Sequence, residues 1–174
     1  NGYVYDSNRY MLRGLLARWP TIMILDAGVV RDDPSKLEIA LRKLGEAADL
    51  ILSSGGVSVG EADFTRVVIS KLGQVHDCHV AMKPGRRIAL GRVGQALYFG
   101  LPGNPVAAAM TFWTVVRPAI EVLLGQSPQV WPLKRAIAGH RIEKKPGRTE
   151  FHRGLVELDE QERSHFFASS DQGS

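Results

Sequence analysis

The chain has little cysteine and no long apolar run. Cys78 is the one cysteine among 174 residues, so no disulfide can form within the chain, and a free thiol is typical of a reducing compartment such as the cytoplasm. No run of about 18 apolar residues is found, which predicts that no helix spans a membrane. The first residues carry neither a methionine nor a basic or apolar stretch. From these residues we expect no signal peptide, and we expect a cut inside a longer protein.

An excess of one charge is also lacking. Lys and Arg number 22 against 18 Asp and Glu, and a net charge of +4 is too small to predict a nucleic-acid partner. The distribution is uneven, because the stretch from Cys78 to Ile120 has basic residues and no acid, whereas a group of acids from Asp6 to Asp63 precedes it. If the fold brings the two groups together, the site suits a phosphorylated ligand held with a divalent metal.

The pattern of apolar residues predicts an α/β fold. Apolar residues make up 44% of the chain, which is enough for a packed core. Helical spacing follows Asp6-Ser7-Asn8 and follows 32–35, where Pro34 fits the first helical position. Short apolar runs at 21–25 and 49–52 predict buried strands between helices. We therefore expect a mainly parallel sheet with helices on both faces.

The pattern then changes after a helix expected at 64–72. Short strands are expected at 75–82, 87–93 and 95–99, followed by a long apolar helix at 106–124. Arg117 and Pro118 interrupt that helix, which favours a place in the core over a membrane.

A linker at Gln126-Ser127-Pro128 predicts a domain boundary. We expect residues 1–127 to form the α/β domain and residues 128–174 to begin a small β domain, which ends short. Strand-like stretches in the second unit lie at 133–142, 150–158 and 164–169.

The strongest functional signal is a loop rich in serine and glycine. Ser53-Ser54-Gly55-Gly56-Val57-Ser58-Val59-Gly60 follows the strand at 49–52 and leads to a helix. Ligands bind at the carboxyl ends of strands in open α/β sheets, and glycine N–H groups with serine hydroxyls can surround an anion. The loop predicts a phosphate or polar-ligand site. The alternative is a plain strand-to-helix turn.

Four acids near helix starts have two interpretations. Glu61 and Asp63 follow the serine–glycine loop, and Asp32 and Asp33 precede Pro34. Capping the free N–H groups of a helix is the simpler role, and the local sequence by itself favours it for Asp63. Binding a hard cation or accepting a proton beside the loop is the functional role.

Two further turns carry polar groups. Lys83-Pro84-Gly85-Arg86-Arg87 presents positive charge on a stiff turn, which predicts an anion-binding site or, alternatively, a solvated hairpin. Leu101-Pro102-Gly103-Asn104-Pro105 feeds the long apolar helix, whose start favours anions. Asn104 acting only as a helix cap is an equally weighted alternative.

Several motifs together carry a family resemblance. The segments 53–63, Met82-Lys83-Pro84-Gly85 and 100–105 resemble the molybdopterin molybdenumtransferases of molybdenum-cofactor synthesis. Tyr5-Asp6-Ser7-Asn8 and Arg31-Asp32-Asp33-Pro34 fit in order and spacing, and 147–154 looks like the start of that family's C-terminal β domain. The resemblance covers nearly the whole chain. Ser-Gly-Gly and Pro-Gly-Asn-Pro also occur in the related molybdopterin adenylyltransferases.

The resemblance implies a transferase that inserts molybdate into adenylylated molybdopterin and releases AMP, with Mg²⁺ as the divalent cation. It implies catalytic roles for Asp33, Asp63 and Lys83, and metal binding by Asp32, Asp33 and Asp63. It also implies a set of residues that contact the pterin substrate: Ser54, Gly55, Gly56, Ser58, Glu61, Arg86, Pro102, Gly103, Asn104 and Pro105. A cytoplasmic homodimer, and a molybdopterin adenylyltransferase as partner, are further implications. Neither nucleic acid nor a membrane is expected as a partner.

The chain departs from the family at two positions of the basic region. His79 stands where many members have a lysine, and Arg86-Arg87 replaces a more usual Lys-Pro pair. Members also place a strand and a Gly-Asp-Glu loop before the equivalent of Asn1, so acids expected from that loop are not in this sequence. The alternatives to the transferase are an adenylyltransferase-like domain, which the segment after Gly125 disfavours, and a non-catalytic dimerising scaffold module.

Overall fold

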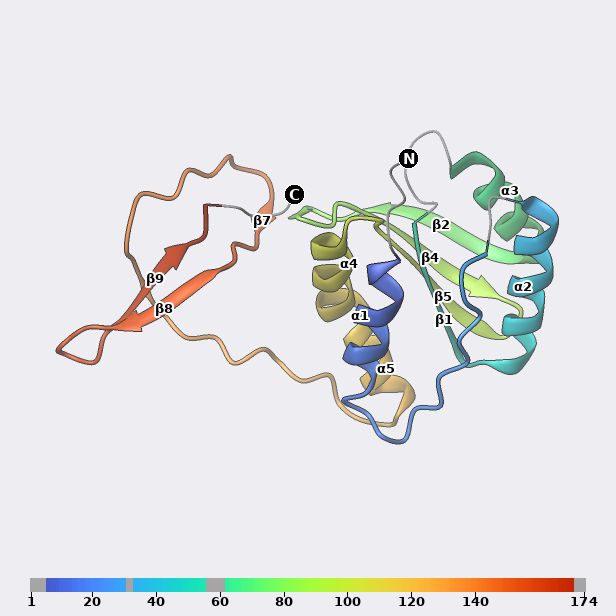
Figure 1. Cartoon of the computed structure of the whole chain (residues 1–174), viewed down its shortest axis with the longest axis horizontal. Helices are drawn as coiled ribbons and strands as arrows, with labels where there is room; N and C mark the ends of the chain where they lie inside the picture. Colours follow the sequence, from blue (N-terminus) through green and yellow to red (C-terminus); the bar gives the residue numbers. More distant parts are fainter. Residues whose placement is uncertain (1–5, 31–32, 56–61, 171–174) are drawn as a thin grey trace.

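Figure 1 shows a computed structural model of the chain, which describes residues 6–30, 33–55 and 62–170. The elements are, in chain order, α1 (Ser7–Leu16), α2 (Pro34–Ala47), β1 (Leu50–Ser54), α3 (Ala62–Leu72), β2 (Gly73–His79), β3 (Met82–Lys83), β4 (Arg87–Val93), β5 (Ala96–Leu101), α4 (Pro105–Thr111), the π-helical turn η1 (Phe112–Val116), α5 (Arg117–Leu123), β6 (Ile137–Ala138), β7 (Thr149–Glu150), β8 (Gly154–Leu158) and β9 (Ser164–Ala168).

Local sequence sets the starts of the helices as expected. Asp33 is the N-cap of α2, with Pro34 in the first turn. Asn104 is the N-cap of α4, and its side-chain oxygen accepts the Ala107 N–H at 3.0 Å. A side-chain acceptor at this position satisfies an N–H group that has no partner within the helix. Both predicted helix starts are confirmed.

The main sheet has four strands in the order β1-β5-β4-β2. β1 pairs with β5 in parallel, whereas β4 pairs with both β5 and β2 in the antiparallel direction. The predicted α/β class is confirmed, but the expectation of a mainly parallel sheet is wrong among the described strands. The reason is the turn at Gly94 and Gln95, because a connection this short joins antiparallel neighbours and cannot make a parallel crossover.

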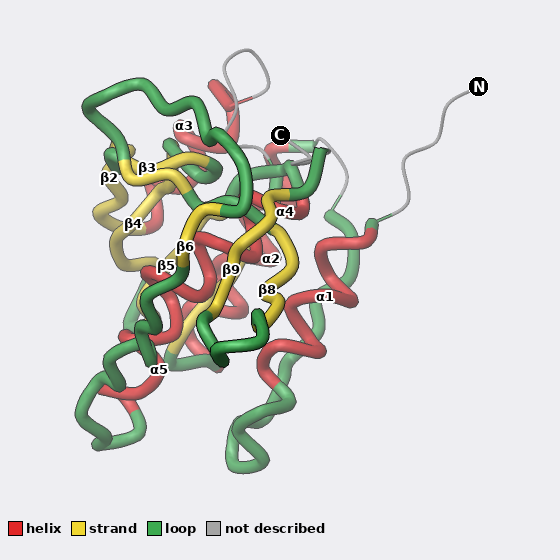
Figure 2. The backbone as a smooth tube through the Cα atoms, turned by 90° about the vertical axis from the view of Figure 1, so that its left-hand side faces the viewer, coloured by secondary structure: helices red, strands yellow, loops and turns green. Residues whose placement is uncertain are grey.

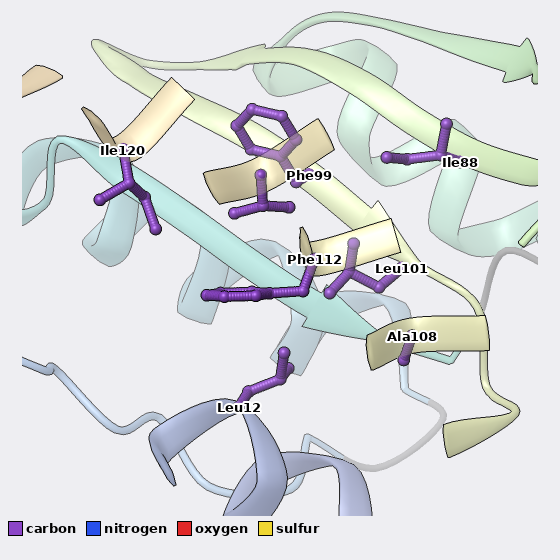
Figure 3. Close-up of a cluster of buried hydrophobic side chains, with 8 residues drawn as sticks. Leu12, Ile88, Phe99, Leu101, Ala108, Phe112 and Ile120 are labelled. Atoms are coloured by element: carbon purple, nitrogen blue, oxygen red, sulfur yellow. The ribbon is translucent and has the colours of Figure 1, made fainter. Parts of the chain in front are cut away.

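Helices cover both faces of this sheet, as predicted. Side chains alternate along each strand, so that in β5 Phe99 and Leu101 face one core and Ala96 and Tyr98 face the other. The first core lies under α1, α4, η1 and α5, and the second lies under α2 and α3. In Figure 3, Phe112 lies between Leu12 of α1 and the residues of the sheet.

The strand predicted at 21–25 is wrong. The segment has no strand geometry, and Met23 is 80% exposed while Ile24 and Leu25 are 38% and 43% exposed. A strand needs a neighbour for its backbone N–H and C=O groups, and no described strand pairs with this segment. The apolar character of residues 21–25 was therefore not enough to make them a strand.

The long apolar helix is continuous from Pro105 to Leu123 and contains the π-helical turn η1. By length and composition these 19 residues could cross a membrane, although Arg117 and Glu121 interrupt the apolar run. Its face with Ala108, Phe112 and Ile120 packs in the first core, which favours a core helix. The π turn ends just before Pro118, where a proline removes a helical hydrogen bond and crowds the preceding turn.

The last part of the chain forms short strands. β6, β9 and β8 lie side by side in one sheet, as Figure 2 shows, and β7 pairs instead with β3. The strand stretches predicted near 150–158 and 164–169 are present in shorter form, whereas 133–142 contains only the two residues of β6. The division into units 1–127 and 128–174 stays a prediction.

The chain after α5 is fastened to the helix by a buried ion pair. The guanidinium of Arg117 donates to the carboxylate of Glu121 at 2.7 Å, and the Gln129 N–H donates to the same carboxylate at 2.9 Å. Arg117 also lies 5.8 Å from the ring centre of Trp113 and 5.3 Å from that of Trp131. These contacts order the chain beyond α5.

This ion pair predicts a pH dependence of stability. Hydrogen bonds from Arg117 and from the Gln129 N–H hold the pKa of Glu121 below its ordinary value of 4.5. A lowered folded-state pKa contributes stability above pH 4.5 that is lost as pH falls towards the folded-state pKa. We expect Glu121→Gln to lower the midpoint of thermal unfolding at pH 7, and the difference from wild type to shrink between pH 5 and 3. A difference that is constant with pH would contradict this account.

Candidate functional site

Three loops meet at one edge of the main sheet. β1 and β5 are parallel, and Ser54 at the end of β1 is in register with Leu101 at the end of β5. The loops that follow these strands therefore emerge side by side. β4 runs in the opposite direction, so the turn before it, at 84–86, reaches the same edge. The start of the serine–glycine loop at Gly55, the turn at 84–86 and the loop that begins at Pro102 thus lie along the same edge of the sheet.

Helix starts gather at this edge too. α2 leads into β1 after a short connection, so its N-terminal end with Asp33 lies at the far end, where β1 stops. α3 begins after β1, which places Asp63 in its first turn at the same edge. Figure 1 shows both helix starts, and that of α1, on the side of the sheet where β1 ends. The backbone thus brings acidic positions to the edge that carries Lys83.

The serine–glycine loop touches the Pro102–Gly103 loop directly. The Gly55 N–H donates to the Leu101 carbonyl at 3.3 Å, and the Ser54 hydroxyl donates to the Pro102 carbonyl at 3.4 Å. A Cβ on Gly103 would lie 3.8 Å from the Cα of Gly55. Gly55 has φ +84°, a backbone conformation that glycine adopts without strain. These contacts make the two loops one continuous surface.

Asn8 is a polar residue of this edge that the sequence interpretation missed. It lies in the first turn of α1 and is only 7% exposed. Its Nδ2 donates to Ser54 Oγ at 2.6 Å and to the Gly103 carbonyl at 2.8 Å. A signal was present, because Asn8 is one helical turn before Leu12 and so lies on the apolar face of α1.

The Lys83 turn is fixed by the burial of Met82 and by the pairing of β3 with β7. Met82 is 3% exposed, whereas the Lys83 side chain is exposed and has no ion pair among the described residues. The Lys83 carbonyl accepts the Phe151 N–H at 2.8 Å, which belongs to the parallel pairing of β3 with β7. Arg86 is exposed beside it, and its carbonyl accepts the Val80 N–H at 2.8 Å. The turn therefore presents two cations on a fixed backbone.

Pairing with β7 brings Glu150 and His152 to this turn, which the sequence did not predict. Glu150 is in register with Lys83, and its side chain is only 7% exposed. His152 Nε2 lies 3.3 Å from a carboxylate oxygen of Glu150. The segment that resembles the start of a β domain is therefore structurally part of the Lys83 turn.

Gly85 is required at its position for two separate reasons. Its φ is +96°, and a Cβ there would lie 2.7 Å from Thr111 Oγ1 and 2.8 Å from Met82 Cε. Backbone strain and steric conflict therefore act together.

We expect Gly85→Ala to destabilise the protein by about 2–3 kcal/mol, measured by chemical unfolding, and to move the Lys83 turn. Gly147→Ala is the matched control, because Gly147 has φ +98° with nothing within 4 Å. The control should show the strain alone, so equal losses for the two variants would contradict the role of packing against Thr111.

Asp33 is already engaged in capping. Its carboxylate accepts the N–H groups of Ser35 at 2.9 Å and Lys36 at 3.2 Å. Hydrogen bonds from the backbone N–H groups of Lys36 and Ser35 hold the pKa of Asp33 below its ordinary value. The carboxylate is thus kept ionised at the edge of the site, and the simpler of its two roles is the one the contacts display.

Several predicted site residues lie outside the described part of the chain. These are Asp32, Gly56, Ser58 and Glu61, together with the side chain of Asp63. Of the rest, Pro102 is half-buried, and Asn104 and Pro105 start α4 as cap and first residue. Within 6–30, 33–55 and 62–170, no three His, Cys, Asp or Glu side chains gather as metal ligands would.

Curated proteins similar to this chain have names that point to molybdenum-cofactor synthesis. A curated molybdopterin molybdenumtransferase of Haemophilus influenzae is 40% identical over 177 aligned positions, covering 100% of this chain and 43% of the relative. The chain also covers 35% of a second molybdopterin molybdenumtransferase, from Nostoc, at 35% identity. The chain therefore spans about two fifths of the length of these relatives.

Solved structures show the same fold. The molybdopterin biosynthesis MoeA protein of Pyrococcus horikosii covers 95% of this chain with a TM-score of 0.73 and 27% identity, and the match takes up 39% of that protein. The molybdopterin biosynthesis enzyme MoaB of Thermus thermophilus covers 72% of this chain, with a TM-score of 0.56 and 23% identity. At that identity the second likeness concerns the fold alone.

A protein-family match completes the comparison. The family described as the probable molybdopterin binding domain matches residues 1–122, which is well over half of the 174 residues. The matched range includes the serine–glycine loop, the Lys83 turn and the Pro102–Gly103 loop. The chain belongs to the family of the probable molybdopterin binding domain.

Proposed function

We propose that this chain is the substrate-binding part of an enzyme that inserts molybdate into adenylylated molybdopterin and releases AMP. The observation that carries the proposal is the meeting of the serine–glycine loop, the Lys83 turn and the Pro102–Gly103 loop at one sheet edge. The relatives named molybdopterin molybdenumtransferases support a role in molybdenum-cofactor biosynthesis.

The chemistry of the edge suits a substrate rich in anionic oxygens. Backbone N–H groups that follow Gly55 in the serine–glycine loop would donate to phosphate oxygens. Lys83 and Arg86, held on a fixed turn, would lie against the phosphate or molybdate oxygens. When the bond to AMP breaks, negative charge develops on phosphate oxygens, and a positioned ammonium group stabilises it without having to reorganise.

Mg²⁺ belongs to the proposal as the cation that Asp63 and either Asp32 or Asp33 would hold. Oxygen ligands are the kind that Mg²⁺ prefers. Asp33 alone among these carboxylates is described, and it already accepts two N–H groups. We therefore derive no step through the metal, and the steps above rest on Lys83, Arg86 and the two loops.

The remaining expectations are proposals of the same kind. We propose a cytoplasmic homodimer that receives its substrate from a molybdopterin adenylyltransferase. The adenylyltransferase-like alternative has less support, because the relatives at 40% and 35% identity are named molybdopterin molybdenumtransferases.

Turnover by the full-length protein tests the proposal. Adenylylated molybdopterin, molybdate and Mg²⁺ should together give one AMP for each molybdenum cofactor formed, with little AMP when molybdate is left out. Formation of adenylylated molybdopterin from molybdopterin and ATP would instead support the adenylyltransferase. Retained peptide binding with no AMP release would support the scaffold module.

A further inference from the structure

Asn8 ties together two loops that are far apart in the chain. Its Nδ2 group donates one hydrogen bond to Ser54 Oγ at 2.6 Å and another to the Gly103 carbonyl at 2.8 Å. These partners lie 46 and 95 residues away, at the ends of β1 and β5. Since Ser54 Oγ also donates to the Pro102 carbonyl at 3.4 Å, the amide completes a small network across the edge.

The chemistry of the contacts fixes the orientation of the amide. The Gly103 carbonyl can only accept, so the atom facing it is the NH₂ group. The other amide atom, Asn8 Oδ1, is buried and has no hydrogen-bond partner within the described residues. A buried oxygen without a partner costs free energy, so packing of α1 alone would be served better by an apolar side chain.

We propose that Asn8 is a positioning residue that holds the start of the serine–glycine loop, Ser54 and Gly55, at a fixed separation from the Pro102–Gly103 loop. This inference rests on the proposed function of that edge. Asn8 acts through Ser54 and Gly103, which anchor the two loops that would contact the ligand. Loops that are already ordered lose less entropy when a ligand binds. Removing the two hydrogen bonds of Asn8 should therefore weaken substrate binding more than it slows the chemical step.

Three variants of the full-length protein separate positioning from stability. Asn8→Ala removes the amide, and Asn8→Asp keeps its size while removing both N–H donors. Leu12→Val is the matched control, because Leu12 is also 7% exposed, one turn along the same helix, and packs in the first core instead of against the loops. Leu12→Val weakens the packing of α1 against the first core and leaves the hydrogen bonds of Asn8 intact.

The kinetic readout is AMP release with adenylylated molybdopterin and molybdate. For both Asn8 variants we expect KM to rise about tenfold while kcat changes less than about twofold, the pattern of lost uniform binding. Leu12→Val should leave KM unchanged, even if its unfolding midpoint falls as far as the midpoints of the Asn8 variants. Wild-type KM in Asn8→Asp, or an equal rise in Leu12→Val, would overturn the inference.

A second readout needs no ligand. The Gly55 N–H donates to the Leu101 carbonyl between the two loops, so its hydrogen exchange reports their separation. We expect this amide to exchange about tenfold faster in both Asn8 variants and unchanged in Leu12→Val. If the wild-type protein releases no AMP, the proposed function fails, and this measurement decides the inference alone. Unchanged exchange in Asn8→Ala would then overturn it.

Discussion

Lys83→Ala in the full-length protein should lower molybdate-dependent AMP release about 100-fold, the scale seen when one positioned electrostatic donor is removed from a reacting centre. The side chain is exposed and has no described ion pair, while its backbone is fixed by β7 and by packing at Gly85. The ammonium group is therefore available to an anion. Because its backbone is already ordered, binding an anion costs little backbone entropy. The expected loss includes weaker substrate binding, which should be most pronounced at low salt because mobile ions screen such contacts.

Lys71→Ala is the matched control for this variant. Lys71 lies in the last turn of α3, at the other end of that helix from the site, and its removal changes the net charge by the same amount. It should leave turnover within about twofold. Lys83→Arg keeps the charge with a different shape and should recover part of the activity. Equal turnover in Lys83→Ala and Lys71→Ala would refute the assignment of Lys83.

Asp63→Asn should also depress AMP release, by about 100-fold, with the fold unchanged. Asp63 lies in the first turn of α3, at the edge where β1 ends, and under the proposed function its carboxylate would hold the cation that balances phosphate charge. Exchange of one oxygen for NH₂ removes that charge at nearly constant size. Circular dichroism and the unfolding midpoint check the fold, and a titration with Mg²⁺ checks the cation.

Asp49→Asn makes the same exchange at the opposite end of the sheet. Asp49 is exposed and directly precedes β1, whereas Asp63 follows the loop after it. The control should keep turnover and Mg²⁺ dependence close to wild type. If Asp63→Asn also keeps both, Asp63 is a helix-capping residue and the acidic side of the proposed site must come from elsewhere.

The parts predicted correctly from the sequence are those that short-range patterns determine. Helical spacing and capping residues gave the starts of α2 and α4. The strand predicted at 49–52, which is Leu50–Ser54 in the structure, gave the position of the serine–glycine loop to within two residues. The meeting of three loops followed from the rule that ligands bind where strands end. The contacts of Gly55 with Leu101 and of Ser54 with Pro102 agree with the rule.

The parts predicted wrongly depend on pairing between distant segments. Residues 21–25 read as a strand, but strand formation requires a neighbour that a local pattern cannot supply. The direction of β4 depends on a tight turn at Gly94, which made the sheet mixed. The roles of Asn8 and of β7 were missed for the same reason, because their partners lie far away in the sequence.

The claim that distant carboxylates, cations and polar loops converge on one ligand can be tested by hydrogen-exchange footprinting. The full-length protein would be measured with and without adenylylated molybdopterin. The account predicts slower exchange in three separate stretches, 53–55, 83–87 and 101–104, with no change at Gly125 or in β8. Protection confined to other regions, or to one of the three stretches, would contradict it.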